Sequence, residues 1–382
     1  MHSTLIGLAS LALASALPDP LPVNGDGPTD SPGVRAEVLA IHASTIVVGD
    51  GSVIEDGVLL VEGDRIRAVG AGIDVPEGAI SIEHDGFLTA GMVAPHSTLL
   101  PGDERSDSTD PFMAEAELRY GFDPGRDEVE AAARNGVTSA VLTSSSGAVV
   151  GGLTAVVKTH GGVVIDPRAH LSVSMTSSAA NQNRYPTSYA GIVRELLERF
   201  GEGATGTYAE ARAGELPVLI QANGNDECQR AMYVAEANGL RGALLGARRV
   251  GEQLEALRAS GLGVVFTVLG TGNDERDIDA MVAVAQSDVT YGFALTDPTN
   301  LRLTGATLVR AGADANSVWT ALTSGGARLA GVADSVGTLK RGMHADLCLW
   351  SGHPLDLTST LEGVMIGGER VELSTESEGA NH

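Results

Sequence analysis

The sequence predicts an α/β protein, with a TIM-like (β/α)8 barrel and a small β-sandwich domain made from the N- and C-terminal segments. From residue 91 onward, apolar strand-like runs alternate with helical segments at intervals of ~25 residues. This is the pattern of a parallel sheet, and about eight such units favour a barrel. On either side of this region the sequence has strand patterns and tight turns without helices. Because the two strand-rich regions bracket the barrel, we expect them to pair into one sandwich.

The predicted sandwich domain comprises residues 36–90 and 340–373. Apolar runs, or runs that alternate with the period of two expected of a half-buried strand, mark its strands. They are residues 38–44, 57–61, 65–69, 79–83, 345–350 and 363–366. The turns Gly63-Asp64 and Gly367-Gly368 indicate two hairpins.

The predicted barrel comprises residues 91–339. Its strands are short apolar runs, and its helices are longer amphipathic segments that end near Gly or Pro. The expected strands are 91–95, 137–142, 153–157, 171–175, 217–220, 242–245, 263–268 and 289–295. The expected helices are 127–134, 189–200, 226–238, 250–260, 277–286, 300–311 and 316–329.

The two ends of the chain carry no fold pattern. Residues 1–16 have the apolar run and the Ala14-Ser15-Ala16 site of a signal peptide, which predicts a secreted or periplasmic protein. The run has no preceding Lys or Arg, so a disordered leader or a misplaced start codon is the alternative. Residues 17–35 are rich in Pro, Gly and Asp and indicate a linker, and residues 374–382 a disordered tail.

The composition excludes several partners. A net charge of −24 argues against binding to nucleic acid or to an anionic membrane surface, because both require a basic surface. No stretch is long and apolar enough for a membrane span. The two cysteines, Cys228 and Cys348, fall in different parts of the predicted fold, so we expect two buried thiols rather than a disulfide.

Four stretches carry a resemblance to a known family. The stretch 90–98 (AGMVAPHST) resembles a motif in which Pro-Gly and two apolar residues precede Asp-x-His-x-His. Tyr185-Pro-Thr-Ser188, residues 215–223 and residues 320–346 match further elements, the last over its whole Gly-x-Leu-x-x-Gly-x-x-Ala-Asp signature. On these residues the chain resembles the amidohydrolase superfamily, and most closely its imidazolonepropionase-like subgroup. The resemblance covers about Val38 to Val371 and implies hydrolysis of non-peptide C–N bonds, such as those of cyclic amides.

The family places a catalytic metal at the barrel mouth, held by residues at the C-terminal ends of the strands. His96 takes the position of the first histidine ligand, whereas Thr98 takes that of the second and Ala94 that of the aspartate. The resemblance implies that Asp297 occupies the position of the general base, which also touches the metal. As metal ligands, only His96 and Asp297 are retained.

The remaining ligand positions hold residues that bind zinc poorly. Gln221 and Asn223 stand where the family has a His-Ala-His pair, and Leu245 stands where it has a further histidine. Amide side chains still offer hydrogen bonds, so Thr98, Gln221 and Asn223 are candidate ligand-binding residues. We therefore expect no cofactor, with Zn2+ the metal if the site works.

Our first hypothesis is a pseudoenzyme that has lost its metal centre and binds a small molecule or a partner at the barrel mouth. The alternative is an active hydrolase with a mononuclear or metal-free site that uses Asp297 and His96. A third hypothesis is association with an intact paralogue, and a homodimer is also expected of the fold. Each residue has a simpler interpretation. His96 is then a hydrogen-bonded mouth histidine, Asp297 caps the following helix or fixes a turn, and Gln221 and Asn223 pair with each other or with the backbone.

Overall fold

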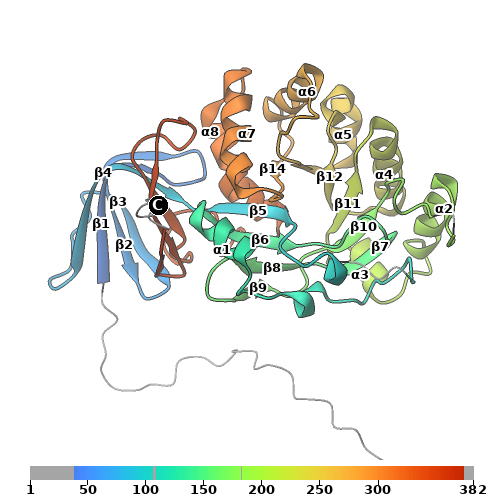
Figure 1. The fold of residues 1–382 in the computed structure, drawn as a ribbon, viewed down its shortest axis with the longest axis horizontal. Coiled ribbons are helices and arrows are strands. Elements are labelled where there is room, and N and C mark those ends of the chain that lie inside the picture. Colours follow the sequence, from blue (N-terminus) through green and yellow to red (C-terminus); the bar gives the residue numbers. More distant parts are fainter. Residues whose placement is uncertain (1–37, 106–108, 182, 374–382) are drawn as a thin grey trace, which may run out of the picture. The chain divides into compact units, whose positions relative to one another are not determined.

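The computed structural model describes residues 38–105, 109–181 and 183–373 (Figure 1). The predicted signal peptide (1–16), linker (17–35) and C-terminal tail (374–382) lie outside the described residues. The described chain is a mixed α/β fold whose strands form three sheets. In this part of the chain no helix is both long enough and apolar enough to cross a membrane.

One sheet of seven strands contains strands from both ends of the chain, in the order β17-β16-β15-β4-β1-β2-β3. Its strands are β1 (Val38–Val47), β2 (Val53–Glu62), β3 (Arg65–Ala71), β4 (Ile80–Ala90), β15 (Leu347–Trp350), β16 (Leu361–Ile366) and β17 (Glu369–Val371). The N- and C-terminal parts meet where β4 pairs antiparallel with β15, with Ala90 opposite Leu347. The two ends therefore pair, as the sequence predicts, but in a single hydrogen-bonded sheet. The two facing sheets of a sandwich stay a prediction.

The edge strand β3 also contacts the chain that leads into β15. The Ile66 N–H donates to the Met343 carbonyl at 2.9 Å, and the Gly342 N–H donates to the Ile66 carbonyl at 2.8 Å. Buried apolar side chains from β1, β2 and β4, including Ile41, Leu59 and Leu88, form a core of their own. The small domain is thus held by apolar burial as well as by its ladder.

The other two sheets have the orders β14-β13-β12-β11-β10-β7 and β5-β6-β8-β9. Their strands are β5 (Met92–Ser97), β6 (Val137–Leu142), β7 (Val150–Leu153), β8 (Ala155–Lys158), β9 (Val164–Asp166), β10 (Leu171–Ser174), β11 (Val218–Ala222), β12 (Gly242–Gly246), β13 (Gly263–Phe266) and β14 (Tyr291–Phe293). The α-helices are α1 (Asp127–Arg134), α2 (Tyr189–Arg199), α3 (Thr207–Arg212), α4 (Asn225–Asn238), α5 (Leu254–Ser260), α6 (Glu275–Ala285), α7 (Pro298–Arg310), α8 (Ala315–Thr320) and α9 (Gly326–Leu329).

Hydrogen bonds connect these two sheets at both ends. Beyond β14, the Leu295 N–H donates to the His96 carbonyl at 2.7 Å, and the Thr98 N–H donates to the Leu295 carbonyl at 3.1 Å, which joins β14 to β5. At the other end, β7 continues into β8 through Thr154, so one extended segment pairs with β10 and then with β6. The parallel strands β10 to β14 and β5 to β6 therefore end on the same edge.

The extended segment from β7 to β8 differs from the sequence prediction of a parallel strand that follows a helix. It runs antiparallel to both β6 and β10. Only residues 143–149 separate it from β6, and a parallel crossover needs a dozen residues or more. The short connection therefore fixes the antiparallel direction, and it interrupts the β-then-α alternation that β5, α1 and β6 begin and that resumes at β10.

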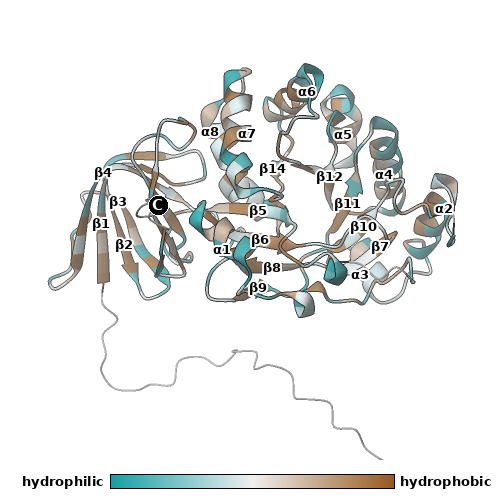
Figure 2. Cartoon of the chain, viewed as in Figure 1, coloured by the Kyte–Doolittle hydropathy of each residue, from teal (hydrophilic) through white to brown (hydrophobic). Residues whose placement is uncertain are grey.

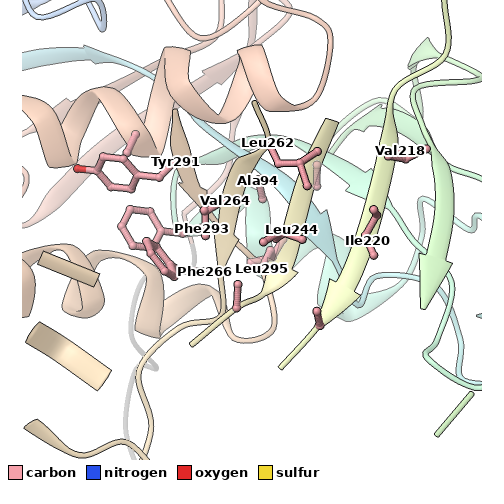
Figure 3. Packing of buried hydrophobic residues seen from close by; sticks show 14 of the residues in the cluster. Ala94, Val218, Ile220, Leu244, Leu262, Val264, Phe266, Tyr291, Phe293 and Leu295 are labelled. Carbon is pink, nitrogen blue, oxygen red and sulfur yellow. The ribbon is translucent and has the colours of Figure 1, made fainter. Parts of the chain in front are cut away.

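The strands β11 to β14 have two apolar faces. On one face Val218, Ile220, Leu244, Phe266 and Phe293 belong to the largest core cluster (Figure 3). The alternate residues on the other face, among them Leu219, Leu245 and Val265, form a separate small cluster against Leu329. The apolar side chains are buried on both faces, which is expected of a parallel sheet that is covered on each side. In Figure 2 brown is prominent but not continuous on these strands, and the helices carry teal patches.

A buried ion pair connects β8 to the chain just before β15. The Lys158 Nζ lies 2.6 Å from Asp346 Oδ1, and the two side chains are 4% and 2% exposed. The Gly367 N–H donates to the same oxygen at 2.7 Å. Asp346 Oδ2 is buried and has no partner among the described residues. This pair therefore ties the seven-stranded sheet to the strands of the larger domain.

Candidate functional site

The five residues singled out from the sequence lie at one edge of the strands. His96 is in β5, and Thr98 follows it, with their backbones bonded to Leu295 beyond β14. Gln221 is near the end of β11 and lies opposite Leu245 of β12. Asn223 follows β11 directly, and Asp297 lies four residues beyond the end of β14. Because parallel strands carry their carboxyl ends to a common edge, these positions form one polar rim.

His96 is buried, with 6% of its surface exposed. Its Nδ1 lies 2.6 Å from Thr143 Oγ1, and Thr143 Oγ1 donates to the Ser97 carbonyl at 2.9 Å. The threonine hydroxyl has a single hydrogen, and a carbonyl oxygen only accepts. Thr143 therefore accepts from His96 Nδ1–H. This assignment leaves the lone pair of the neutral imidazole on Nε2.

The environment of His96 keeps it neutral. Burial, with a smaller contribution from the positive charge of Arg105, lowers the pKa of His96 to about 3. At pH 7 the ring is therefore an uncharged acceptor through Nε2. A base with so low a pKa holds a proton poorly, so His96 is suited to hydrogen bonding rather than to general-base work.

Arg105 is the cation of this rim. Its Nε donates to the Thr143 carbonyl at 3.3 Å, which places the guanidinium beside the His96–Thr143 pair. Burial lowers the pKa of Arg105, though far too little to discharge a guanidinium. Among the residues that the structure describes, no carboxylate forms an ion pair with it, although the chain has 49 acidic residues.

Asp297 is the N-cap of α7. Its Oδ1 accepts from the Thr299 N–H at 2.9 Å and from the Thr299 hydroxyl at 2.6 Å, and its Oδ2 accepts from Asn300 Nδ2 at 3.0 Å. Pro298 occupies the first turn, where its missing N–H costs no hydrogen bond. Both carboxylate oxygens thus serve the helix start, which is the simpler interpretation of this residue given above.

The amide residues Asn223 and Gln221 have different surroundings. Asn223 is exposed, and its N–H donates to Glu227 Oε2 at 2.8 Å. Its Oδ1 covers Gly246, where a Cβ would come within 2.5 Å of that oxygen. Gln221 is half-buried, and no hydrogen bond joins the Gln221 and Asn223 side chains, so they are not mutual partners. Leu245 is buried on the inner apolar face.

The residues at this rim do not fit a catalytic zinc ion. Zinc in such a site takes three protein ligands, usually histidine or carboxylate, and keeps an open position. Among residues 38–105, 109–181 and 183–373, no three His, Cys, Asp or Glu side chains are grouped so as to hold a metal. His96 offers one nitrogen, Asp297 is engaged at α7, and Leu245 has no donor atom. The donor atoms at the rim are therefore unsuited to zinc-dependent catalysis.

Sequence reasoning missed Thr143 and Arg105. Thr143 follows β6 directly, so its position at the carboxyl end of a strand was a usable signal. Arg105 lies in a connection rich in acidic residues, after Asp103 and Glu104, and no pattern distinguishes it from a surface arginine. Its role follows only from the long-range contact with Thr143.

The three sheets and the polar rim define a mixed α/β protein. No protein-family model and no curated protein matches the chain. Among solved structures, it resembles an amidohydrolase from Thermotoga maritima with a TM-score of 0.78 and 21% identity, over 87% of this chain and 99% of that one. It also resembles molinate hydrolase (TM-score 0.59, 14% identity, 92% and 100% of the chains) and the ochratoxinase of A. niger (0.58, 16%, 88% and 96%).

At these identities the likeness concerns the fold. The comparison confirms the fold that the four sequence stretches implied, so the chain has the amidohydrolase fold. Its chemistry has to be argued from its own residues.

Proposed function

We propose that this chain is a binding protein with the amidohydrolase fold, in which the former metal site recognises a small molecule without zinc. The linked strands β5, β6, β7–β8 and β10 to β14 would close as a barrel, with the polar rim at its mouth. The observation that supports the proposal is the engagement of Asp297: its Oδ1 caps α7 through the Thr299 N–H, and its Oδ2 accepts from the Asn300 side-chain amide. His96 is the one remaining imidazole, and its Nδ1 is bound to Thr143.

The chemistry of the rim suggests the class of ligand. His96 Nε2 offers a lone pair to an N–H or O–H group, and Arg105 offers a planar cation that suits a carboxylate. Both side chains bond to Thr143: His96 bonds to its hydroxyl, and Arg105 bonds to its carbonyl. A small molecule with an N–H next to a carboxylate, such as an N-acylated amino acid, satisfies both.

The second candidate function is hydrolysis of a non-peptide C–N bond, with Asp297 and His96 in a reduced or metal-free site. It is favoured by the names of similar structures, which include molinate hydrolase and phenylurea hydrolase B. The pKa of about 3 makes His96 a weak base, and Asp297 would have to leave its cap. We therefore place binding first.

Metal content separates the binding proposal from a hydrolase with a mononuclear metal site, whereas release of product separates it from a metal-free hydrolase. The purified chain is incubated with zinc, dialysed exhaustively and assayed for zinc per chain. We expect no retained zinc, in the wild type or in the His96→Ala, Asp297→Ala double variant. Near-stoichiometric zinc in the wild type that is lost in the double variant contradicts the binding proposal and favours the hydrolase.

Ligand recognition is tested by calorimetric titration with N-acetylated amino acids. Binding should weaken at least tenfold in Arg105→Ala and in His96→Ala. It should be unchanged in Arg276→Ala, a matched surface arginine of α6 that pairs with Glu252 at 2.8 Å. Release of the free amine, followed by chromatography, would show that the chain hydrolyses the compound instead of only binding it.

A further inference from the structure

We infer that the hydroxyl pair of Ser144 and Ser172 donates a hydrogen bond to the acyl oxygen of the ligand, an inference that rests on the function proposed above. Ser144 follows β6, and Ser172 is in β10. Their Oγ atoms are 2.7 Å apart, and the two residues are 4% and 8% exposed. The pair therefore connects two strands through side chains that are almost wholly buried.

A glycine on the intervening strand makes room for the hydroxyl pair. Gly151 is in β7, which pairs with β10 and continues into β8 beside β6. A Cβ at Gly151 would come within 2.1 Å of Ser144 Oγ and 3.8 Å of Ser172 Oγ. Any side chain at this position would therefore displace the Ser144 hydroxyl, so the contact between the two serines depends on the glycine.

The hydroxyl pair has one hydrogen more than it can use. Each serine hydroxyl carries a single hydrogen and can also accept. Whichever serine donates within the pair, the hydrogen of the other serine needs an acceptor. In the described part of the chain, neither Oγ has a further hydrogen-bond partner. Because a buried donor without an acceptor is unfavourable, this hydrogen is suited to an oxygen that enters with a ligand.

A second hydroxyl pair on the same strand has all its hydrogens accepted. Ser174 Oγ donates to the Ser146 carbonyl at 3.1 Å, and Thr176 Oγ1 lies 3.0 Å from Ser174 Oγ. Since the hydrogen of Ser174 goes to the carbonyl, Thr176 donates to Ser174. Of these two pairs, only that of Ser144 and Ser172 has a hydrogen to give.

Arg105 contacts both chain neighbours of Ser144. Its Nε donates to the Thr143 carbonyl at 3.3 Å, and its carbonyl accepts from the Ser145 N–H at 2.8 Å. Arg105 and Gly151 also line one cavity of about 580 Å³. The spare hydroxyl hydrogen is therefore close to the cation that we assign to the carboxylate of the ligand.

The hydrogen-bonding groups of an N-acylated amino acid match those of the rim in number and kind. The ligand has one donor, its amide N–H, and two acceptors, its carboxylate and its acyl oxygen. The N–H and the acyl oxygen point to opposite sides of a trans amide. With the N–H at His96 Nε2 and the carboxylate at Arg105, the acyl oxygen is the remaining acceptor, and the serine pair supplies the remaining donor.

Calorimetric titration of the full chain with N-acetylglycine and N-thioacetylglycine tests the inference. The two compounds differ only in the acyl atom, and sulfur accepts hydrogen bonds more weakly than oxygen. We expect the wild type to bind the oxygen compound roughly tenfold more tightly than the sulfur compound. The double variant Ser144→Ala, Ser172→Ala should bind both about equally. Both serines are replaced because one remaining hydroxyl could still donate, and because removal of both leaves no unpaired partner.

Ser174→Ala is the matched control, because it removes a buried serine of the same strand whose hydrogen already has an acceptor. It should keep the preference for oxygen. A preference that persists in the double variant, or that is lost in Ser174→Ala as well, overturns the inference. So does a loss of affinity for both compounds at an unchanged ratio, which is what a merely structural role would produce. If neither compound binds the wild type, the proposed function itself fails, and the inference fails with it.

Discussion

His96 and Thr143 show how one hydrogen bond sets the chemistry of a residue. Because Thr143 is committed to the Ser97 carbonyl, His96 keeps its proton on Nδ1 and its lone pair on Nε2. The prediction is that the ring of His96 stays neutral, with Nδ1 protonated, from pH 8 down to at least pH 5. Nitrogen NMR of the labelled imidazole measures both properties, and a titration near the ordinary value of 6.5 would contradict the assignment.

The same low pKa predicts an acid loss of stability. In the unfolded chain His96 has a pKa of about 6.5 and is protonated below that pH, whereas in the folded chain it stays neutral. The unfolded state therefore binds more protons between pH 6.5 and 3. As the pH falls through that window, the free energy of unfolding should decrease because of His96 by roughly 1.4 kcal/mol for each pH unit. Denaturant unfolding of the wild type and of His96→Asn at several pH values isolates the pH-dependent loss that comes from His96, and this loss should be missing in the variant.

In Asp50, unlike in His96, the fold stabilises the charged form of the side chain. Burial raises its pKa, but the hydrogen bonds from Lys340 and Ser52 outweigh burial and lower the pKa to about 2. Stability from this group is therefore present above the unfolded value of about 3.8 and is lost as the pH falls toward 2. We predict that Asp50→Asn destabilises the chain at pH 7, by less than about 1 kcal/mol because the pair is partly exposed. The difference between the two proteins should vanish at pH 2, as followed by thermal unfolding.

At the residue scale, sequence reasoning located the polar rim but not its partners. His96, Asp297 and Gln221 were placed at strand ends because strand ends can be read from apolar runs. The partner of His96 is 47 residues away, and that of Asp50 is far along the chain at Lys340. Such contacts depend on how the strands are laid side by side, which no local pattern specifies.

At the scale of elements, α7 depends on Asp297 for its start. Replacing an N-cap aspartate by alanine removes the acceptors of exposed N–H groups and costs ~1 kcal/mol. We predict that Asp297→Ala lowers the free energy of unfolding by about this amount, while Asp297→Asn lowers it by less, because asparagine also caps helices well. Urea unfolding of the two variants measures the difference. Equal losses in both would argue that the carboxylate has a role other than capping.

The strand from β7 to β8 shows which part of an element can be predicted. Its existence followed from an apolar run, and the expected strand 153–157 overlaps it. Its direction did not follow from the run, because direction is set by the length of the connection, here residues 143–149. The helix expected at 316–329 likewise spans the right residues but is divided into α8, a π-helical turn (Ala321–Gly325) and α9. The close approach of Gly326 to the Val93 carbonyl accounts for glycine at that point.

At the scale of the whole molecule, Lys158 and Asp346 join the two parts of the described chain. Removing one partner of a buried pair leaves the other charge without compensation and costs ~3–5 kcal/mol, whereas replacing both by apolar groups costs little. We predict a loss of this size in Lys158→Met and a much smaller loss in Lys158→Met, Asp346→Leu. Chemical denaturation of the three proteins measures the coupling. A larger loss in the double variant than in the single one would show that the contact with Gly367, rather than the ion pair, is what stabilises Asp346.

The overall architecture was the most predictable level, since it rests on many weak signals that agree. The strand-rich ends, the central alternation and the signature at 320–346 all favoured the fold that the structural comparison confirms. The pairing of the two ends in one ladder could be anticipated, but the sandwich could not be established from sequence. Whether two sheets face each other depends on how the edge at β3 meets residues 342–345.

The pairing of β4 with β15 has a consequence during synthesis of the chain. The partner of Ala90 is Leu347, so the ribosome makes β4 ~250 residues before the strand that covers its open edge. At ~5–20 residues per second this interval is roughly 10–50 s. During that time an unpaired strand that contains Phe87 and Leu88 is open to pairing with other chains. The domain that is first in sequence is therefore among the last to be completed, and slow translation or a truncated C-terminus should favour aggregation through β4.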